Sequence, residues 1–473
     1  MEIIIVGGGV GGVFTSLQLL SNGFNGEDIT ILEQGNLIEN RKCFVDKNTS
    51  CKNCGICNIT HGIAGCGAFS DSKLNFDEYS RVGGDLGIFY SPNELENLME
   101  QVEKYYNYFG MNNLNIIEEK RTDEANDLIK YMNNIDNLEF HDCRTIHLGT
   151  DRSQVIYKNM QDYLLDNGVK IYPKTEIKDM KIHNNGRITL YTKDKYCYSA
   201  DKVVFAVGRS GNEFLNNLFN KNNIKTIPSK IDIGCRIETT NEVMDKLNRN
   251  FYEAKIYLKD RLYNDECRVF CTNPSGIVAH EKWNTSIGNI STVNGHAYAN
   301  KDLKTNNTNF ALLVSKEFNG DIKDPLNDYV FPMIRMANSL AGGTDKVLMQ
   351  SLKDLKLHRR STEETIKECN LKPTLKATYG DISLVLPYRI LTTILDSIEI
   401  LDKVVNGLNN GENTFLYAPE CKFHSNKILI DKYGKTTNDN VYAIGDGSGY
   451  CRGIIQSAVH GILCANNIIN KER

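Results

Sequence analysis

Three glycines near the start of the chain have the spacing of a nucleotide-binding turn. Gly7, Gly9 and Gly12 satisfy G-x-G-x-x-G, directly after the apolar run 3–6 and before a stretch with helical character. In this pattern the first glycine permits a tight turn, the second lets the backbone approach a diphosphate, and the third lets helix and strand pack closely. The helix then directs its positive N-terminal end at the phosphates. Glycines near a turn can also be purely structural, but the flanking elements favour a dinucleotide site.

An acidic residue stands where such sites recognise ribose. Glu33 ends the second expected strand, over 29–33, some twenty residues past Gly12. Its carboxylate suits the ribose hydroxyls of an adenosine half.

The C-terminal part of the chain decides between the possible dinucleotides. Gly445 and Asp446 follow an apolar run and precede a helix expected over 453–468. A carboxylate there can accept hydrogen bonds from the ribityl chain of a flavin, and the helix dipole would favour a reduced flavin ring. The alternative is a strand and helix joined by an ordinary capping aspartate. The two ends together favour FAD, and Gly208, after the buried run 203–207, would lie where the chain returns over it.

Four cysteines are crowded into fifteen residues. Cys43, Cys51, Cys54 and Cys57 have the spacing C-x7-C-x2-C-x2-C. Thiols at this spacing can converge on one centre, either an iron–sulfur cluster or zinc, and the sequence does not separate the two. A redox-active thiol pair and a reduced structural loop are the other interpretations. Cys66 is an alternative fourth ligand.

The elements around these motifs predict the organisation of the chain. Both ends are rich in β-α units and the middle is mixed, which predicts an α/β protein: a discontinuous Rossmann-like FAD-binding domain with an inserted mixed α+β substrate domain. Helices are expected near 308–318 and 388–405, and a polar hairpin around 184–186. The expected segments are 1–92, 143–227 and 425–473 for the FAD-binding domain, 93–142 for a mostly helical insertion, and 228–424 for the substrate domain.

Several unusual motifs give the chain a recognisable signature. It resembles the largely uncharacterised FAD-dependent dehydrogenase family of two-domain flavoproteins. The motifs that carry the resemblance, beyond the glycine motif and the Gly-Asp-Gly end, are Arg41–Cys43, Gly65–Leu74, Val82–Asp85, Gly149–Arg152, Asp232–Glu238, Phe270–Cys271, Pro274–Gly276, Val293–Gly295 and Tyr417–Glu420.

The resemblance implies that the segment 65–74 lies along the flavin, although by itself it would be taken for a surface turn. With the motifs above, it gives a set of expected cofactor-binding residues. These are Gly7, Gly9, Val10, Gly11, Gly12, Glu33, Gln34, Arg41, Gly67, Ser70, Asp71, Gly208, Gly445, Asp446, Gly453 and Ile454.

A flavoenzyme needs few catalytic side chains, because the flavin itself carries the redox chemistry. Lys73, Tyr450 and Arg452 are the candidates near the expected ring, and a cation at position 452 could stabilise an anionic reduced flavin. His460, inside an apolar run, is more typical of a core histidine. Arg236 and His296 could face the substrate, but spacing alone gives neither a firm role.

Composition excludes some classes of protein. The 473 residues carry a formal net charge of −4, which leaves no basic footprint for nucleic acid. No apolar run is long enough to span a membrane and no signal peptide is seen, so we expect a cytoplasmic protein with mostly reduced thiols.

The leading hypothesis is an FAD-dependent oxidoreductase that acts on a small molecule by hydride transfer. Without a second G-x-G-x-x-G there is no dedicated nicotinamide domain, so NAD(P)H would dock transiently in the substrate cleft. Otherwise electrons would leave through the cysteine centre to a redox partner protein. The alternatives are an electron-transfer flavoprotein and, more weakly, an RNA-modifying flavoprotein.

Overall fold

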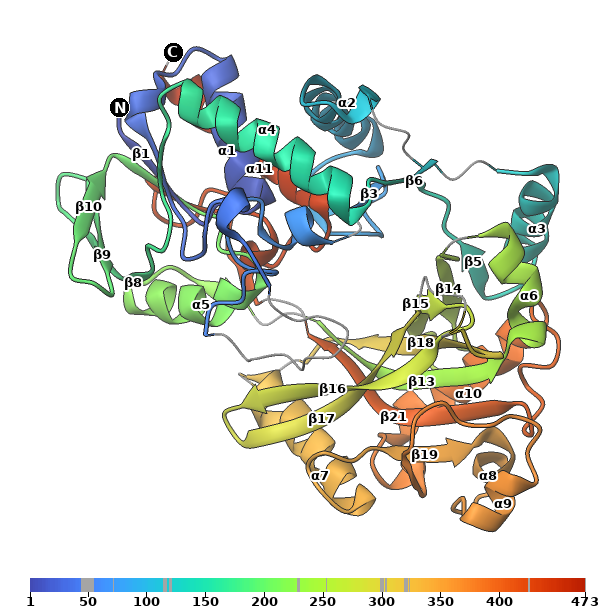
Figure 1. Ribbon diagram of the computed structural model, residues 1–473. Helices are drawn as coiled ribbons and strands as arrows, with labels where there is room; N and C mark the ends of the chain where they lie inside the picture. Colours follow the sequence, from blue (N-terminus) through green and yellow to red (C-terminus); the bar gives the residue numbers. More distant parts are fainter. Residues whose placement is uncertain are drawn as a thin grey trace. The chain divides into compact units, whose positions relative to one another are not determined.

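The computed structural model divides into two compact units, each assembled from separate stretches of the chain (Figure 1). The first unit comprises Met1–Glu118, Cys143–Ser229 and His424–Arg473, and the second comprises Glu119–Asp142 and Lys230–Phe423. The residues that the structure describes are 1–43, 55–70, 72–113, 117–118, 121–227, 230–251, 253–297, 302, 304–318, 322, 324–423 and 426–472.

A five-stranded parallel sheet organises the first unit, with the order β23-β11-β1-β2-β7. Its strands are β1 (Ile3–Val6), β2 (Ile29–Leu32), β7 (Lys170–Tyr172), β11 (Lys202–Phe205) and β23 (Val441–Ala443). Strand β1 is apolar and buried along its whole length, as expected for a parallel strand covered on both faces. Because β23 comes from the C-terminal part of the chain, the domain is discontinuous, and the expected Rossmann-like α/β class is confirmed.

Two helices from opposite ends of the chain pack closely in this unit. They are α1 (Val10–Ser21) and α11 (Ile454–Glu472). A Cβ atom at Gly461 would lie 2.4 Å from the carbonyl oxygen of Gly11, and Thr15 Oγ1 donates to the Gly461 carbonyl at 3.2 Å. Glycine at position 461 therefore allows the helices to approach to backbone contact, which joins the N-terminal and C-terminal parts of the unit.

Smaller elements complete the first unit. An antiparallel sheet holds β8 (Ile177–Ile182), β9 (Ile188–Thr192) and β10 (Cys197–Ala200), so the hairpin expected around 184–186 is confirmed. A second sheet holds β3 (Lys73–Phe76), β4 (Ile117–Glu118) and β6 (Arg144–His147). The remaining longer helices are α2 (Pro92–Tyr108), α4 (Thr150–Asp166) and α5 (Asn212–Lys221).

An eight-stranded sheet organises the second unit, with the order β20-β19-β21-β13-β18-β15-β14-β5. Its central strands are β13 (Ile231–Thr240), β15 (Glu266–Asn273), β18 (Asn307–Lys316) and β21 (Thr414–Phe423), and its outer strands are β5 (Leu138–Phe140), β14 (Ile256–Lys259), β19 (Leu348–Ser351) and β20 (Thr378–Tyr379). A separate hairpin pairs β16 (Ile277–Thr285) with β17 (Gly288–His296). The helices include α3 (Asp123–Asn133), α6 (Asn241–Asn250), α7 (Phe331–Ala341), α8 (Leu352–Lys356), α9 (Glu363–Lys367) and α10 (Tyr388–Asp402).

Alternation along β13 separates the two faces of this sheet. Ile231, Ile233, Cys235 and Ile237 are buried in an apolar core that includes buried residues of α10. The intervening residues, Asp232, Gly234, Arg236 and Glu238, point to the opposite face, because successive side chains of a strand alternate. One face is thus apolar and the other is charged.

Two expectations differ from what is observed. The helix expected near 308–318 is wrong: this stretch is strand β18, which pairs with β13 and β15. A short apolar run in a buried strand has no periodicity that separates it from a helix. The segment 93–142 is divided between the units, because β5 pairs with β14 of the second unit while α2 belongs to the first. The helix expected near 388–405 is confirmed as α10.

Within the described residues, none of the helices has the length and apolar character that crossing a lipid bilayer requires.

Candidate functional site

Three glycine turns meet at one edge of the parallel sheet. Gly7 follows β1, Gly208 lies just beyond β11, and Gly445 lies just beyond β23. Since these strands are parallel neighbours, their carboxyl ends lie at the same edge, which is where open α/β sheets bind their ligands. The sheet thus collects the three glycine positions that the sequence predicted for one cofactor.

The first turn has the geometry that the glycine motif predicts. Gly7 has φ +101°, and a Cβ there would lie 2.4 Å from the Ala206 carbonyl oxygen. A Cβ at Gly12 would lie 2.2 Å from the Gly7 carbonyl oxygen, so helix and strand are in backbone contact. A Cβ at Gly9 would meet only the Ala206 carbonyl oxygen, at 3.8 Å, an ordinary contact, so nothing packs tightly against this position. The open position at the start of α1, which begins with Val10 and Gly11, fits a diphosphate.

Glu33 is buried behind the same turn. Its Oε2 accepts from the Gly8 amide at 2.7 Å, and its Oε1 accepts from the amides of Gly35 (2.7 Å) and Gly62 (3.0 Å). Each carboxylate oxygen can accept two hydrogen bonds, so Oε2 keeps capacity for a ribose hydroxyl. Gln34, the next residue, is half-buried.

Arg41 is buried in the loop that follows. Its guanidinium donates to the carbonyls of Asn58 (2.9 Å), Ile59 (2.7 Å) and Ile63 (2.6 Å), and it stacks over the Phe69 ring at 4.2 Å. Burial lowers the pKa of Arg41 to about 10, which leaves it charged at neutral pH. These contacts show Arg41 holding the 58–63 segment; a direct contact with the cofactor stays a prediction.

The segment expected along the flavin lies against the glycine turn. The Ala64 amide donates to the Gly8 carbonyl at 2.7 Å, and a Cβ at Gly65 would lie 3.5 Å from the Gly9 Cα. Gly67 faces Val10 and the Tyr157 hydroxyl. Of the expected contacts in this segment, Ser70 is half-buried, Lys73 begins β3, and Asp71 lies outside the described residues.

The C-terminal turn brings Asp446 to the site edge. Its carboxylate pairs with Arg209 (Nη2 to Oδ2, 3.1 Å), and the Gly445 amide donates to His460 Nδ1 at 3.3 Å. His460 is fully buried, and burial lowers its pKa to about 3, so the imidazole is neutral. A neutral buried histidine fits a core role and explains how the Gly445 turn is held in place.

The candidate catalytic residues Tyr450 and Arg452 lie in a charged cluster with Asp85. Asp85 pairs with Arg452 at 2.8 Å and with Lys427 at 3.0 Å, and Lys427 lies over the Tyr450 ring at 5.2 Å. Burial would raise the pKa of Asp85, but the two cations outweigh it and hold that pKa below its usual value. Burial raises the pKa of Tyr450, so its phenol stays protonated. Asp85 and Lys427 were not among the predicted site residues, although Val82–Asp85 is one of the recognised motifs.

Helix α11 begins beside this cluster. The amides of Arg452 and Gly453 donate to the Gly83 carbonyl at 2.6 and 2.7 Å, just before Ile454 begins the helix. The motif around Gly83 thus fixes the N-terminus of the helix that was predicted to face the flavin.

The predicted metal site is only partly within the described residues. Cys51 and Cys54 lie outside them, whereas Cys43 is exposed and Cys57 is half-buried. Burial opposes ionisation of Cys57, but backbone amides of Ile59 and Thr60 outweigh it and lower its pKa. In the part of the chain that is described, no three metal-binding side chains come together. The four-cysteine centre remains a prediction.

The second unit places its two candidates differently. Arg236 is fully buried; it donates to Asn309 Oδ1 (2.9 Å) and to the Cys271 carbonyl (2.9 Å), and lies 3.5 Å from Glu420. His296 is exposed at the end of β17. Arg236 is therefore not accessible to a substrate in this structure.

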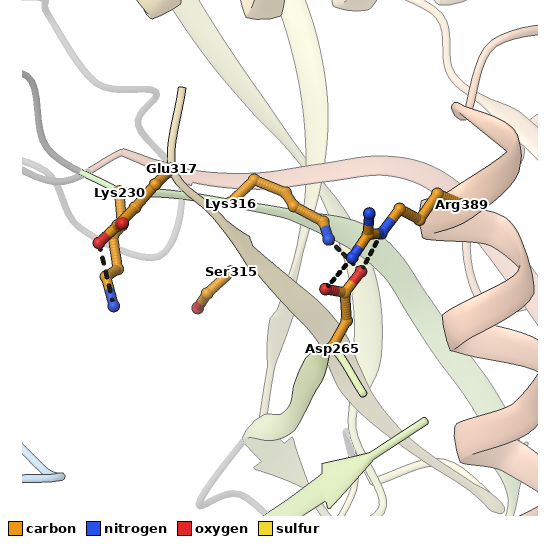
Figure 2. Close-up of a pocket in the computed structure, with 6 residues that line it drawn as sticks. All are labelled: Lys230, Asp265, Ser315, Lys316, Glu317 and Arg389. Carbon is orange, nitrogen blue, oxygen red and sulfur yellow. Dashed lines mark hydrogen bonds and ion pairs between the residues drawn. The ribbon is translucent and has the colours of Figure 1, made fainter. Parts of the chain in front are cut away.

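One pocket of about 350 Å³ lies at an end of the eight-stranded sheet, near the last residues of β18 (Figure 2). Asp265 binds Arg389 through two hydrogen bonds (2.7 and 2.8 Å) and also pairs with Lys316, while Lys230 pairs with Glu317 at 3.3 Å. The three cations and two carboxylates of the lining are all paired, and together they leave one positive charge in excess. The remaining lining residue is Ser315.

Comparisons with known proteins bear on both units. Residues 230–422 match the family model described as FAD-dependent protein, C-terminal domain-like. A curated protein of Clostridium beijerinckii (strain ATCC 51743 / NCIMB 8052), described as uncharacterized, is 24% identical over 484 residues, which span 99% of this chain and 80% of that one.

Two solved structures overlap this chain, both at low structural similarity. Glycine oxidase from Geobacillus kaustophilus has 12% identity and a TM-score of 0.34, covering 100% of this chain and 95% of that one. The halogenase PltM has 10% identity and a TM-score of 0.37, with coverages of 100% and 70%. The family match confirms the expected resemblance to FAD-dependent proteins over the second unit, and FAD as the cofactor.

Proposed function

We propose that this flavoprotein is an oxidoreductase that acts on a small molecule by hydride transfer at the flavin. The observation that carries the proposal is the meeting of three glycine turns at one edge of the parallel sheet, where nothing packs tightly against Gly9. The family match over residues 230–422 supplies the identity of the cofactor. Bound FAD would supply the acceptor or donor of hydride.

The chain's own residues would hold the cofactor and control charge around it. The start of α1 at Gly9 would receive the diphosphate, and Glu33 would accept a hydrogen bond from ribose. Asp446, just beyond β23, would accept a hydrogen bond from the ribityl chain. Arg452, held by Asp85, would keep a positive charge near the site.

Tyr450 would serve as a hydrogen-bond donor, because its raised pKa keeps the phenol protonated at neutral pH and the nearby Lys427 cation lies over its ring. Lys73 is a second candidate, at the end of the segment expected along the flavin. The roles of Tyr450 and Lys73 remain predictions. The same holds for NAD(P)H as a transient reductant and for a cytoplasmic location.

An auxiliary centre would change where the electrons go. If Cys43, Cys51, Cys54 and Cys57 hold an iron–sulfur cluster, electrons could pass to a partner protein, and the chain could then act as an electron-transfer module. Zinc at the same residues would make the site structural.

The test is an absorption spectrum of protein purified without oxygen, with FAD, iron and zinc measured on the same sample. We expect FAD bands that bleach when one metabolite is added anaerobically. Bleaching only by a protein donor such as ferredoxin would favour the electron-transfer function instead. A protein that neither contains FAD nor takes it up would refute the proposal.

A further inference from the structure

The pocket of Figure 2 carries more positive than negative charge. Lys230, Lys316 and Arg389 contribute three positive charges to its lining. Asp265 and Glu317 contribute two negative charges. All the lining residues belong to the second unit, so the pocket is complete within that unit. Its volume of about 350 Å³ lies within the range of ~300–1,000 Å³ that is usual for small-molecule sites. One negative charge on a ligand would balance the excess.

Asp265 is the deepest charged group of this lining and holds two of the cations. Its side chain is 14% exposed, and its two oxygens accept from Arg389 Nε at 2.7 Å and from Arg389 Nη2 at 2.8 Å. Lys316 Nζ also donates to it. Asp265 thus orients both cations, which reduces the conformational freedom that a ligand would have to remove on binding.

Arg389 keeps N–H groups for a ligand. Among the described residues, its guanidinium is hydrogen-bonded only through Nε and Nη2, both to Asp265. A guanidinium has five N–H groups in one plane, so the end formed by Nη1 and the second hydrogen of Nη2 can still bind two oxygens of a carboxylate. Arg389 lies over the Tyr263 ring, 4.8 Å from its centroid, which holds the plane of the guanidinium. Because Arg389 is 53% exposed, the accessible member of this ion pair is the cation.

The charges next to the pocket do not cancel the excess. Ser315, the uncharged lining residue, donates to Asp232, whose other oxygen binds Arg268, so these two charges neutralise one another. Asp260 is 2% exposed and does not line the pocket. Its oxygens accept from three backbone amides, including that of Asp265 at 2.8 Å, so its charge is stabilised within the fold. The accessible excess is therefore one positive charge.

A second arginine of the same unit shows that an ion pair alone does not make such a site. Arg261 is 50% exposed, nearly as much as Arg389, and it binds Asp396 and Glu399. Two carboxylates face this one cation, so the excess there is negative and an anion would be repelled. The balance of charge thus separates Arg389 from Arg261, although both side chains are half-exposed and paired.

We infer that the pocket of Figure 2 binds a small hydrophilic carboxylate, with its anionic group on Arg389 and Lys316. Since every side chain of the lining is charged or a hydroxyl, the rest of the ligand is short and polar. A single positive excess favours a carboxylate over a phosphate monoester, which carries about −1.5 to −2 charges at neutral pH. The inference requires no flavin chemistry, so it stands independently of the proposed function.

Binding can be measured on the full-length, FAD-loaded protein by saturation-transfer difference NMR, with the methyl signal of acetate as the readout. We expect a saturable signal from acetate and none from acetamide, its neutral isostere. Inorganic phosphate should displace acetate only weakly. Equal binding of acetamide, or a signal from acetate that does not saturate, would overturn the inference. Tighter binding of phosphate than of acetate would overturn the assignment to a carboxylate.

Variants locate the site. Arg389→Lys keeps the charge but removes the fork, and we expect acetate to bind about tenfold more weakly, the loss of about one charge-assisted hydrogen bond. Arg261→Lys is the matched control and should bind acetate as the parent protein does. Glu317 is 63% exposed, and Glu317→Gln raises the excess to two positive charges. We expect it to bind acetate about threefold more tightly, because an exposed charge contributes little.

The Glu317→Gln result is decisive because a misfolded variant would not gain affinity. Unchanged or weaker binding in Glu317→Gln would refute the charge argument. Equal weakening in Arg261→Lys and Arg389→Lys would show that acetate does not bind at this pocket. A protein that contains no FAD but binds acetate with these variant effects would refute the proposed function and support this inference.

Discussion

Acidification should weaken the first unit through one buried histidine. His460 is fully buried, and burial lowers its pKa from 6.5 to about 3. Because the folded-state pKa lies below the unfolded one, the neutral imidazole contributes stability that is complete above about pH 6.5 and is lost as the pH falls. Lowering the pH from 7.5 to 5 protonates the His460 imidazole in the unfolded chain but not in the folded protein. At 1.36 kcal/mol per pH unit below the unfolded-state pKa, this lowers the free energy of unfolding by about 2 kcal/mol.

The assay is urea denaturation of the FAD-loaded protein at both pH values, followed by the rise in flavin fluorescence as FAD is released from the first unit. His460→Gln cannot titrate, and its amide oxygen can still accept from the Gly445 amide. On acidification, we expect the free energy of unfolding of the parent protein to fall by about 2 kcal/mol more than that of His460→Gln.

His358→Asn is the matched control, because His358 is exposed and has a positive φ, a backbone conformation that asparagine tolerates. It should lose as much stability on acidification as the parent. Equal losses in the parent and in His460→Gln would refute the reasoning, because they would show that the imidazole is not held neutral by the fold.

Three further perturbations follow from the site. Gly9→Val should fold but lose FAD, since Gly9 has φ −65° and its Cβ would meet only the Ala206 carbonyl oxygen, at 3.8 Å. Gly9→Ala should retain part of the FAD, and flavin content after gel filtration measures both. Asp85→Asn should lower the free energy of unfolding by roughly 1–3 kcal/mol and lower turnover, because Arg452 loses its half-buried, charged partner. Urea denaturation and the rate of flavin bleaching measure these effects. Gly461→Val should lower the melting temperature, because its Cβ would overlap the Gly11 carbonyl and overpacking costs about 1–3 kcal/mol.

Each of these has a result that would contradict it. Full FAD content in Gly9→Val would show that the diphosphate does not approach this glycine. Unchanged turnover in Asp85→Asn would remove Arg452 from the site chemistry. An unshifted melting temperature in Gly461→Val would mean that α1 and α11 separate at little cost.

The sequence predicts features that depend on local spacing. Three predicted features lie at one end of the first unit: the glycine motif, Glu33 and the Gly445–Asp446 turn. Each follows a parallel strand, and the carboxyl ends of parallel strands lie at the same edge of a sheet. Such local patterns need no knowledge of distant contacts. They therefore gave the fold class and the expected cofactor site.

Features set by distant pairing were not predictable. Asp85 meets Arg452 because an isolated bridge pairs Gly84 with Cys451, segments separated by most of the chain. The sequence wrongly predicts a helix where β18 lies, because the burial of this strand between β13 and β15 is a property of the sheet and not of its own residues.

The joining of α1 to α11 also bears on how the protein is made on the ribosome. Strand β23 and helix α11 are synthesised after every other element, so until residues 441–472 emerge, β11 lacks its outer neighbour and the glycine face of α1 has no partner. The eight-stranded sheet, in contrast, has all its strands once β21 is made. The second unit can therefore fold during translation while the first waits for its last segment, with an unpaired strand edge that is prone to aggregate. A nascent chain stalled before residue 441 would expose that edge to chaperones and proteases.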